Sequence, residues 1–242
     1  MKIAFLGVAI GILLVSLVSA DLYYLDEPAP VSLRHGEYMV SARLHSGNGL
    51  LARGAVGLFD RVTLGLSYGV DTVLGHGAPS FGQPLAFQVR ALGLEEGSWY
   101  PSVMGGYESQ GYDGWASDRF RTLPQGVYLV FAKTFWSTRT ELSAGANYLP
   151  LASQPFDGHI AVREFVFPDW DLLLEYDLAL NDGVMRSRFF SGLLNVGIGA
   201  TLGGNLNLKL GLRDILNSRD PDVGDFGLGL NRVFDVSFQQ HF

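Results

Sequence analysis

The stretch GLSYG, residues 65–69, is a place where the sequence spells a catalytic motif. Gly-x-Ser-x-Gly presents a nucleophilic Ser on a sharp turn between a strand and a helix, so it could mark a hydrolase. Here Ser67 lies inside an alternating run in which the apolar residues are Val62, Leu64, Leu66 and Tyr68. Alternation predicts a β-strand, which does not supply that turn. A surface hydrolase is therefore the last of the functions we consider, and we expect no enzyme.

Metal chemistry has little support in the sequence. The His residues at 35, 45, 76, 159 and 241 show no metal-ligand spacing. The segment RDPDVGD brings Asp220, Asp222 and Asp225 together, but without the full ligand pattern of a calcium loop. We predict no metal site and no cofactor, and we interpret 220–225 as a solvated acidic loop, with calcium binding as the open alternative.

Charged residues occur at every second position of several segments, and they form a larger candidate site. In WDLLLEYDLAL, residues 170–180, the apolar side chains alternate with Asp171, Glu175 and Asp177. If the apolar faces of such segments meet lipid, the other faces line a lumen. The charged residues predicted to face that lumen are Arg43, Arg53, Arg90, Glu141, Glu175, Asp177, Lys209 and Arg213. They would either pair with one another in a filled interior or form the charged constriction of a channel.

Twelve segments alternate in this way, which predicts twelve strands, or ten if the weaker patterns fail. They are residues 36–45, 50–58, 62–70, 84–93, 99–108, 124–135, 138–149, 159–167, 170–180, 191–202, 205–215 and 228–242. Connections after even-numbered segments are short, whereas most of those after odd-numbered segments are long and polar. Sorting of loops by end is typical of bacterial outer-membrane barrels. We therefore predict an all-β, transmembrane, antiparallel up-and-down β-barrel.

Aromatic residues lie near both ends of these segments. At the short-turn end are Phe59, Trp99, Trp136 and Trp170, and toward the long-loop end are Tyr68, Tyr107 and Tyr148. Two such girdles are what the two interfaces of a bilayer favour. The last segment ends on Phe242, with Phe238 on the same face. It resembles the C-terminal signal that outer-membrane barrels present to the barrel assembly machinery, although Gln240 stands where that signal carries a second aromatic residue.

The N-terminal 20 residues have the layout of a signal peptide, with Lys2, an apolar run and Val18-Ser19-Ala20 at the end. We predict cleavage after Ala20, a periplasmic segment at 21–35 and a barrel over 36–242 in the outer membrane. The chain has no Cys, so disulfides are excluded. Its net charge is −7, which argues against a nucleic-acid partner.

Two stretches resemble the barrel repeats of YjbH-like outer-membrane proteins, which are associated with exopolysaccharide. The first is LLLEYDLALNDGVMRS with LLNVGIGATLGGNLNLKLGLRDI, and the second is LLARGAVGLFDRVTLGLSYG. The resemblance implies a role in polysaccharide export, with export components as partners, and points to Glu175, Asp177 and Asn181. Whether these residues bind or pack stays open.

Two functions remain in competition. One is a narrow, porin-like channel for small solutes, and the other is a non-conducting accessory barrel in envelope or exopolysaccharide assembly. The alternation also predicts a carboxylate–cation pair inside the barrel, between strands 170–180 and 205–215. Small inward residues on the strand between them would leave room for Glu175 or Asp177 to reach Lys209 or Arg213.

Overall fold

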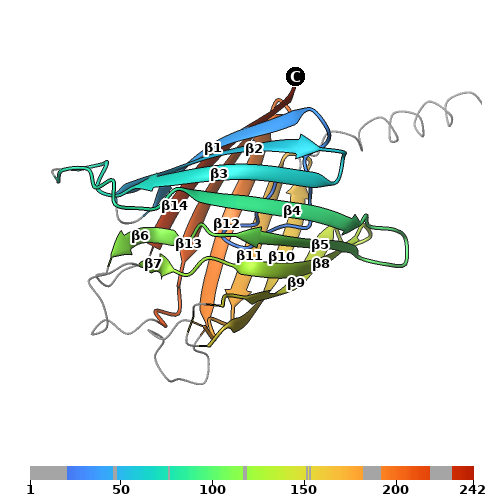
Figure 1. The fold of residues 1–242 in the computed structure, drawn as a ribbon. Helices are drawn as coiled ribbons and strands as arrows, with labels where there is room; N and C mark the ends of the chain where they lie inside the picture. Colours follow the sequence, from blue (N-terminus) through green and yellow to red (C-terminus); the bar gives the residue numbers. More distant parts are fainter. Residues whose placement is uncertain are drawn as a thin grey trace, which may run out of the picture.

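The computed structural model describes residues 21–45, 48–75, 77–116, 119–150, 152, 154–181, 192–218 and 231–242. Most of the chain forms a closed antiparallel barrel (Figure 1). Its strands are β1 (Glu37–His45), β2 (Gly49–Leu58), β3 (Val62–Val70), β4 (Ala86–Leu94), β5 (Ser102–Glu108), β8 (Gly126–Phe135), β9 (Thr140–Tyr148), β10 (Phe156–Phe167), β11 (Trp170–Asp177), β12 (Leu193–Leu202), β13 (Leu206–Arg213) and β14 (Asn231–His241). The predicted fold class and the strand number of twelve are confirmed.

Each barrel strand pairs with its neighbours along the chain, except that a small two-stranded sheet is inserted between β5 and β8. This sheet consists of β6 (Tyr112–Ala116) and β7 (Arg119–Thr122). The first and last strands close the barrel in register from Glu37 opposite His241 to Leu44 opposite Phe234. Closure leaves no strand edge unpaired, which is what a sheet needs in hydrocarbon, where no water can satisfy free backbone groups.

The two faces of the wall differ in chemistry. On β8, the outward side chains Val127, Leu129 and Phe131 are 52%, 44% and 42% exposed, whereas Tyr128 and Val130 are buried. Soluble monomers rarely expose apolar surface that runs continuously around the molecule. A bilayer stabilises such a surface, so the barrel has the outer face of a transmembrane protein. No helix in the described part of the chain is long and apolar enough to span a membrane.

The connections sort by end. The short-turn end carries residues 59–61, 95–101, 136–139, 168–169 and 203–205, and the long-loop end carries 71–85, 109–125, 149–155, 178–192 and 214–230. The turn between β12 and β13 contains Gly203 and Gly204 with φ of +60° and +80°. Two successive positive φ angles match the right-handed twist of the flanking strands and favour glycine at both positions.

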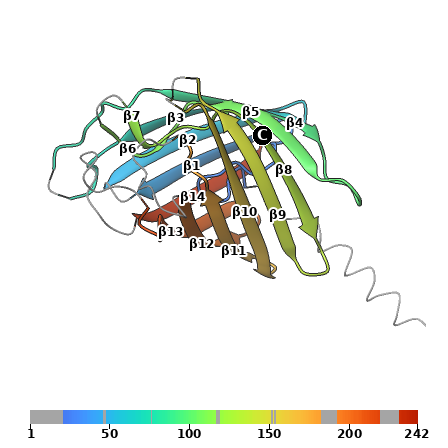
Figure 2. The ribbon, with the colours of Figure 1, turned by 90° about the horizontal axis from the view of Figure 1, so that it is seen from below.

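Residues 21–33 lie inside the barrel, and we call them the N-terminal hairpin. Figures 1 and 2 show this dark-blue segment running within the ring of strands. Leu22, Tyr24, Ala29 and Leu33 are each fully buried. The predicted division into a periplasmic segment at 21–35 and a barrel over 36–242 stays a prediction; residues 21–33 lie within the ring of strands, where the hairpin's polar and charged groups find their partners on the lumen wall. The predicted signal peptide, residues 1–20, lies outside the described residues.

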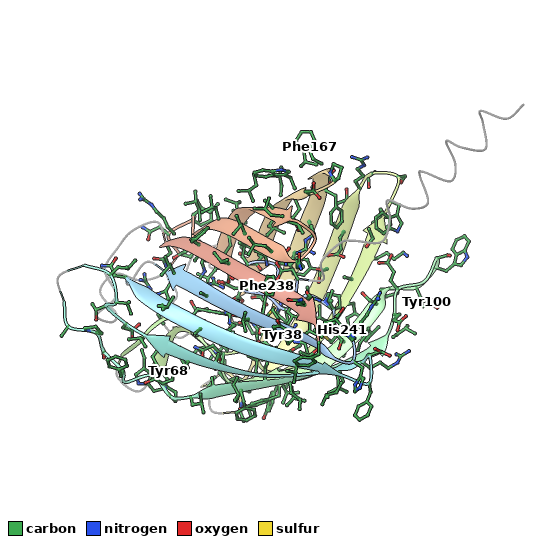
Figure 3. All side chains as sticks on the ribbon, turned by 90° about the horizontal axis from the view of Figure 1, so that it is seen from above. Tyr38, Tyr68, Tyr100, Phe167, Phe238 and His241 are labelled. Atoms are coloured by element: carbon green, nitrogen blue, oxygen red, sulfur yellow. The ribbon has the colours of Figure 1, made fainter. Side chains whose placement is uncertain are left out.

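The seam between β1 and β14 carries an aromatic cluster on the outer face. The Phe242 ring, 81% exposed, stacks on Tyr38 with ring centroids 5.1 Å apart, and Tyr38 also lies 6.5 Å from Phe238. Tyr38 stands directly opposite Gln240 in the register. Its ring thus supplies, from the neighbouring strand, the aromatic group that Gln240 lacks. Figure 3 shows Tyr38 and Phe238 together near His241, and Tyr68 at the opposite end of the barrel.

Candidate functional site

The N-terminal hairpin is a tight reversal of the chain. Tyr23 and Pro28 form an antiparallel bridge, and the amide of Tyr24 donates to the carbonyl of Glu27 at 2.9 Å. This places Leu25 and Asp26 at the tip. At its base the amide of Leu33 donates to Thr63 Oγ1 at 2.9 Å, close to the short-turn end. The hairpin therefore enters the lumen from that end and turns back within it.

Glu175 holds the tip through the backbone. Its carboxylate accepts the amide hydrogens of Leu25, Asp26 and Glu27 at 2.7, 2.9 and 2.9 Å. It also accepts from Asn195 Nδ2 at 3.1 Å. A fully buried carboxylate is costly unless donors surround it, and three amides of one turn supply them. The tip and β11 therefore satisfy each other.

Asp26 is the second anchor of the tip. Its carboxylate forms ion pairs with Arg43 of β1 and Arg213 of β13, while Arg43 Nη1 donates to the carbonyl of Leu25 at 2.9 Å. Tyr112 of β6 lies against both guanidinium groups, 4.5 Å from Arg43 and 5.7 Å from Arg213. The Tyr112 hydroxyl donates to the carbonyl of Asp26 at 3.3 Å. We call Arg43, Arg213 and Tyr112 the arginine clamp.

Four further wall cations contact the N-terminal hairpin, and one of them is Arg163, whose guanidinium lies over the Tyr24 ring at 5.1 Å. Arg90 donates to the carbonyl of Leu22 at 2.7 Å, and Lys209 donates to the carbonyls of Tyr23 and Tyr24, the latter at 2.6 Å. Lys209 also pairs with Asp21 at 2.6 Å. The Arg53 guanidinium lies over the Tyr23 ring at 4.8 Å and pairs with Asp235 at 3.6 Å. The carbonyl oxygens of the hairpin thus accept hydrogen bonds from the wall's cations, and its carboxylates form ion pairs with them.

The hairpin also bonds to the opposite side of the lumen. Glu27 lies 2.7 Å from His159 Nδ1 and accepts from Gln125 at 3.1 Å. The hydroxyl of Tyr24 donates to Glu141 at 2.8 Å. The hydroxyl of Tyr23 donates to Gln88 of β4 at 2.7 Å and to Glu108 of the adjacent β5 at 2.8 Å. The hairpin therefore connects wall groups that face each other across the lumen.

The wall charges separate by side. Basic Lys209, Arg213, Arg43, Arg53 and Arg90 come from the contiguous arc β13-β14-β1-β2-β3-β4, whereas acidic Glu108, Glu141, Asp157, Asp171, Glu175 and Asp177 come from β5-β8-β9-β10-β11. Glu37 and Asp235 on the basic arc and Arg163 and His159 on the acidic arc are the exceptions among the described strand residues of inward phase. Cations and carboxylates thus face each other across the lumen with the hairpin between them.

The predicted pair between strands β11 and β13 is wrong. Lys209 pairs with Asp21 and Arg213 with Asp26, while Glu175 binds amides of the tip. Asp171 pairs instead with Arg163 of the adjacent β10 at 3.0 Å. The small residues of β12 do leave space, but the tip fills it: a Cβ built at Gly197 would lie 2.7 Å from Leu25 Cδ2. A third segment therefore occupies the gap that the two strands would have bridged.

The structure places the eight predicted lumen charges on the inner face. Arg43, Arg53, Arg90, Glu175, Lys209 and Arg213 are buried, and Glu141 and Asp177 are partly buried. Asp177 accepts the amide of Ala179 at 2.8 Å toward the long-loop end. Ser67 also faces inward from β3, where its hydroxyl donates to Gln110 at 2.9 Å.

The aromatic residues predicted as girdles lie at the two ends. Phe59, Trp99, Trp136 and Trp170, at the short-turn end, are 77%, 96%, 68% and 47% exposed, and Tyr148 at the other end is 39% exposed. Tyr68 and Tyr107 are partly buried. The Asp220–Asp225 segment lies outside the described residues.

Sequence reasoning missed Arg163, Glu108 and Asp157, and above all the N-terminal hairpin. A signal for the hairpin was present in YYLDEPAP, where apolar residues flank an acidic pair followed by Pro28. Proline after two polar residues is typical of a turn. Three carboxylates and no basic residue in 21–33 are also complementary to the cations that alternation places in the lumen.

Comparisons with known proteins add the general likeness of the barrel. No protein-family model and no curated protein matches the chain. Among solved structures, it is similar to the KdgM porin (TM-score 0.48, 11% identity, 84% of this chain and 99% of that one). It is also similar to the NanC porin (0.47, 8%, 85% and 99%) and to the Acinetobacter baumannii outer membrane protein Omp33 (0.45, 7%, 88% and 100%). At these values the likeness assigns neither a family nor a solute, and the YjbH-like resemblance stays a prediction.

Proposed function

We propose that this chain is an outer-membrane, porin-like channel for small solutes whose lumen is closed by its own N-terminal hairpin. The observation that carries the proposal is that the wall's cations and carboxylates meet through this hairpin. A lumen filled permanently by the wall itself would pair its charges between neighbouring strands. Here Arg43, Lys209 and Arg213 pair with carboxylates of the hairpin, while Arg90–Glu108 and Arg163–Asp171, at 4.0 and 3.0 Å, are pairs made between neighbouring wall strands.

The size of the barrel supports a channel beneath the hairpin. About eight strands enclose only side chains, and 16 to 18 leave an open aqueous pore, so twelve strands lie between these limits. The space inside is taken here by a folded segment of 13 residues, 21–33, together with the long wall side chains that contact it, such as Arg43, Arg90 and Arg213. Gly197 and Gly211 line the wall where Leu25 of the tip packs. Withdrawal of the hairpin would leave a narrow, charged passage.

The outer-membrane location rests on the outer face and on the ends. Apolar side chains cover the wall between two sets of aromatic residues, and short turns occupy one end. Bacterial outer-membrane barrels have this arrangement, with the short turns in the periplasm. We infer that the N-terminal hairpin enters from the periplasmic side, as a cleaved precursor would allow.

A disulfide that locks the tip tests the proposal. The chain has no Cys, and a Cβ built at Gly211 would lie 3.0 Å from Leu25 Cδ2, so Leu25→Cys with Gly211→Cys places two thiols at the contact between tip and wall, and oxidation tests whether they cross-link. In planar bilayers we expect discrete openings from the unmodified barrel, silence from the oxidised pair and recovery with reductant. A second pair, Ser32→Cys with Thr63→Cys, whose hydroxyl oxygens are 3.0 Å apart, locks only the base and serves as the matched control.

Deletion of residues 22–31 is the complementary variant. Once heat-modifiable migration shows that it is folded, it should conduct steadily. Silence of this folded barrel would overturn the channel.

The second candidate is a non-conducting accessory barrel in envelope or exopolysaccharide assembly. The density of buried contacts to the hairpin favours it, since Glu175, Asp26 and Lys209 together tie the tip at many atoms. Under this alternative the hairpin is a permanent part of the core. Its removal would then unfold the barrel, bilayers would stay silent, and the protein would co-purify with polysaccharide-export components.

A further inference from the structure

The arginine clamp holds a carboxylate that belongs to the chain itself. Asp26 forms ion pairs with both Arg43 and Arg213, and all three side chains are almost completely buried. We infer that the clamp is a binding site for a small organic anion, and that Asp26 occupies it in the closed state as an internal substitute for that anion. This inference rests on the proposed channel and names the class of solute that its lumen recognises.

Part of the clamp's geometry is set without the hairpin, although Arg43 Nη1 also donates to the carbonyl of Leu25 at 2.9 Å and the Tyr112 hydroxyl to that of Asp26 at 3.3 Å. Arg43 comes from β1, Arg213 from β13 and Tyr112 from β6, and the aromatic ring lies against both guanidinium groups. Arg213 Nη2 also donates to Thr122 of β7 at 3.2 Å. Guanidinium groups stacked on an aromatic face keep a fixed orientation and bind carboxylates through directed hydrogen bonds. The site therefore remains when Asp26 leaves.

Charge decides the sign of the ligand. The N-terminal hairpin carries Asp21, Asp26 and Glu27 and no basic residue, so its withdrawal takes three carboxylates out of the lumen. The described wall charges around the clamp then include Arg53, which lies over the Tyr112 ring at 5.2 Å and pairs with Asp235 at 3.6 Å, together with Arg90, Lys209, Glu108 and Glu175. With Arg43 and Arg213 these are five cations against three carboxylates, which leaves an excess of positive charge. An anion is favoured there over a cation or a neutral solute.

The position of Glu175 narrows the chemical class of the ligand further. In the closed state its carboxylate accepts three amide hydrogens from the residues at and beside Asp26. A ligand that replaces the tip must carry hydrogen-bond donors close to the ligand's own carboxylate. Otherwise the ligand buries Glu175 without the donors that the tip had supplied. Hydroxy acids have this arrangement, with the carboxylate for the arginine clamp and hydroxyl groups for Glu175. The structure therefore favours hydroxylated carboxylates over simple fatty acids and over neutral polyols.

Current block by three probes tests this assignment. Gluconate carries both a carboxylate and hydroxyl groups, propionate has only the carboxylate, and sorbitol has only the hydroxyl groups. The channels are the full chain with Asp26→Asn and, as a second background, the deletion of residues 22–31. At about 0.1 M salt, where the screening length is about 10 Å, gluconate should block at the lowest concentration. In the unmodified chain gluconate should instead raise the open probability, because it competes with Asp26.

Substitutions in the wall identify the site. Arg43→Ala or Arg213→Ala should each weaken block by gluconate about tenfold or more, as expected for loss of a charged hydrogen-bonding partner. The matched control is Arg232→Ala, which removes the same charge from the outward face of β14 and should leave the block unchanged. Arg43→Lys and Arg213→Lys should retain part of the block by gluconate, since Lys keeps the charge but not the directed pair of donors.

The outcomes separate the two proposals. If the barrel conducts but Arg43→Ala and Arg213→Ala leave the block by gluconate unchanged, the anion site is overturned and the channel stands. Equal block by gluconate and propionate overturns the requirement for hydroxyl groups. If neither folded background conducts, the channel is overturned. Calorimetric titration of gluconate into the folded deletion variant then decides the anion site alone: binding lost with Arg213→Ala supports it, and absence of binding refutes it.

Discussion

The inner and outer faces of the barrel wall are built from alternate residues of the same strands, yet they are completed in different ways. On β13, Lys209 is 7% exposed and its neighbour Leu210 is 57% exposed. The outer face needs only lipid, which any apolar side chain satisfies. The inner face needs specific partners, and these come from the N-terminal hairpin and from Tyr112 of β6. The outer face therefore tolerates exchange among apolar residues, whereas the inner face depends on individual atoms.

The largest effect is expected at Glu175. Substitution to Ala removes the acceptor of three tip amides and should weaken docking of the hairpin by about 3–5 kcal/mol, as for other broken buried charge contacts. The Leu25–Asp26 bond, whose two side chains are each 3% exposed in the intact protein, should then become a cleavage site for a protease that cuts on the amino side of Asp. Glu95→Ala, at an exposed carboxylate of the β4–β5 turn, is the control. Equal resistance of the Glu175→Ala variant and the unmodified protein to the protease would show that other contacts hold the N-terminal hairpin in the lumen.

A charge on the outer face sharpens the comparison. Leu129→Arg on β8 puts a guanidinium among lipid tails and should destabilise the folded barrel by about 2–4 kcal/mol if the residue lies near the bilayer midplane. Leu129→Ile should be close to neutral, because the outer face has no fixed partner for this side chain. Reversible unfolding in urea with lipid vesicles measures both. A neutral Leu129→Arg would mean that this face does not meet hydrocarbon.

Loss of the Tyr112 ring should have an intermediate effect on the inner face. Tyr112→Ala removes a stacking surface shared by Arg43, Arg53 and Arg213. The loss of these partly desolvated cation–π contacts should cost about 1–2 kcal/mol. We expect more frequent channel openings and a lower unfolding midpoint of the barrel, because the buried ring is also lost from the packed lumen. Tyr112→Phe keeps the ring and should lie close to the unmodified protein. Equal effects of the two substitutions would assign the role to the hydroxyl group instead.

Deletion of Phe242 tests the outer face at the seam. Its ring contributes a stacked pair with Tyr38, about 0.5–1.5 kcal/mol beyond the area that the pair buries. If the residue also belongs to the signal for the barrel assembly machinery, folded barrel in cells should fall by more than this stability loss accounts for. Heat-modifiable protein in outer-membrane fractions, compared with refolding in vitro, separates the two contributions. Unchanged levels in cells would show that the closing hairpin carries the signal without Phe242.

The smallest effect belongs to the rim, where water reaches both partners. Although partial burial opposes it, hydrogen bonds from Lys133 and Thr134 lower the pKa of Glu96 below its usual range. A lowered pKa means stability that is present above the unfolded-state pKa, near 4.5, and is lost as the pH falls through the folded-state value. Glu96→Gln should cost under about 1 kcal/mol at neutral pH and flatten the acid limb of the unfolding curve. An acid limb unchanged by Glu96→Gln would contradict this assignment.

Alternation in the sequence predicted the barrel well because each strand's pattern is local. The segments with the weakest patterns, 84–93, 124–135 and 159–167, are β4, β8 and β10. Alternation along 124–135 does not decide the face of Lys133; in the structure it is the outer one, where the side chain reaches the β4–β5 turn and pairs with Glu96 at 2.8 Å. Near the rim, a charged residue on the outer face can reach a carboxylate in a neighbouring turn. The periodicity of the sequence does not show that such a partner is present.

By itself the sequence determined the strands, their phase and the sorting of loops, because a period of two and the turn residues are read along the chain. It also placed Arg43, Glu175, Lys209 and Arg213 on the lumen phase. Only the tertiary structure decided what these charges meet. Asp26 lies 149 residues before Glu175 and 187 before Arg213 in the chain. Closing the barrel brings these distant groups around one turn, and the hairpin then becomes the partner that neighbouring strands do not provide.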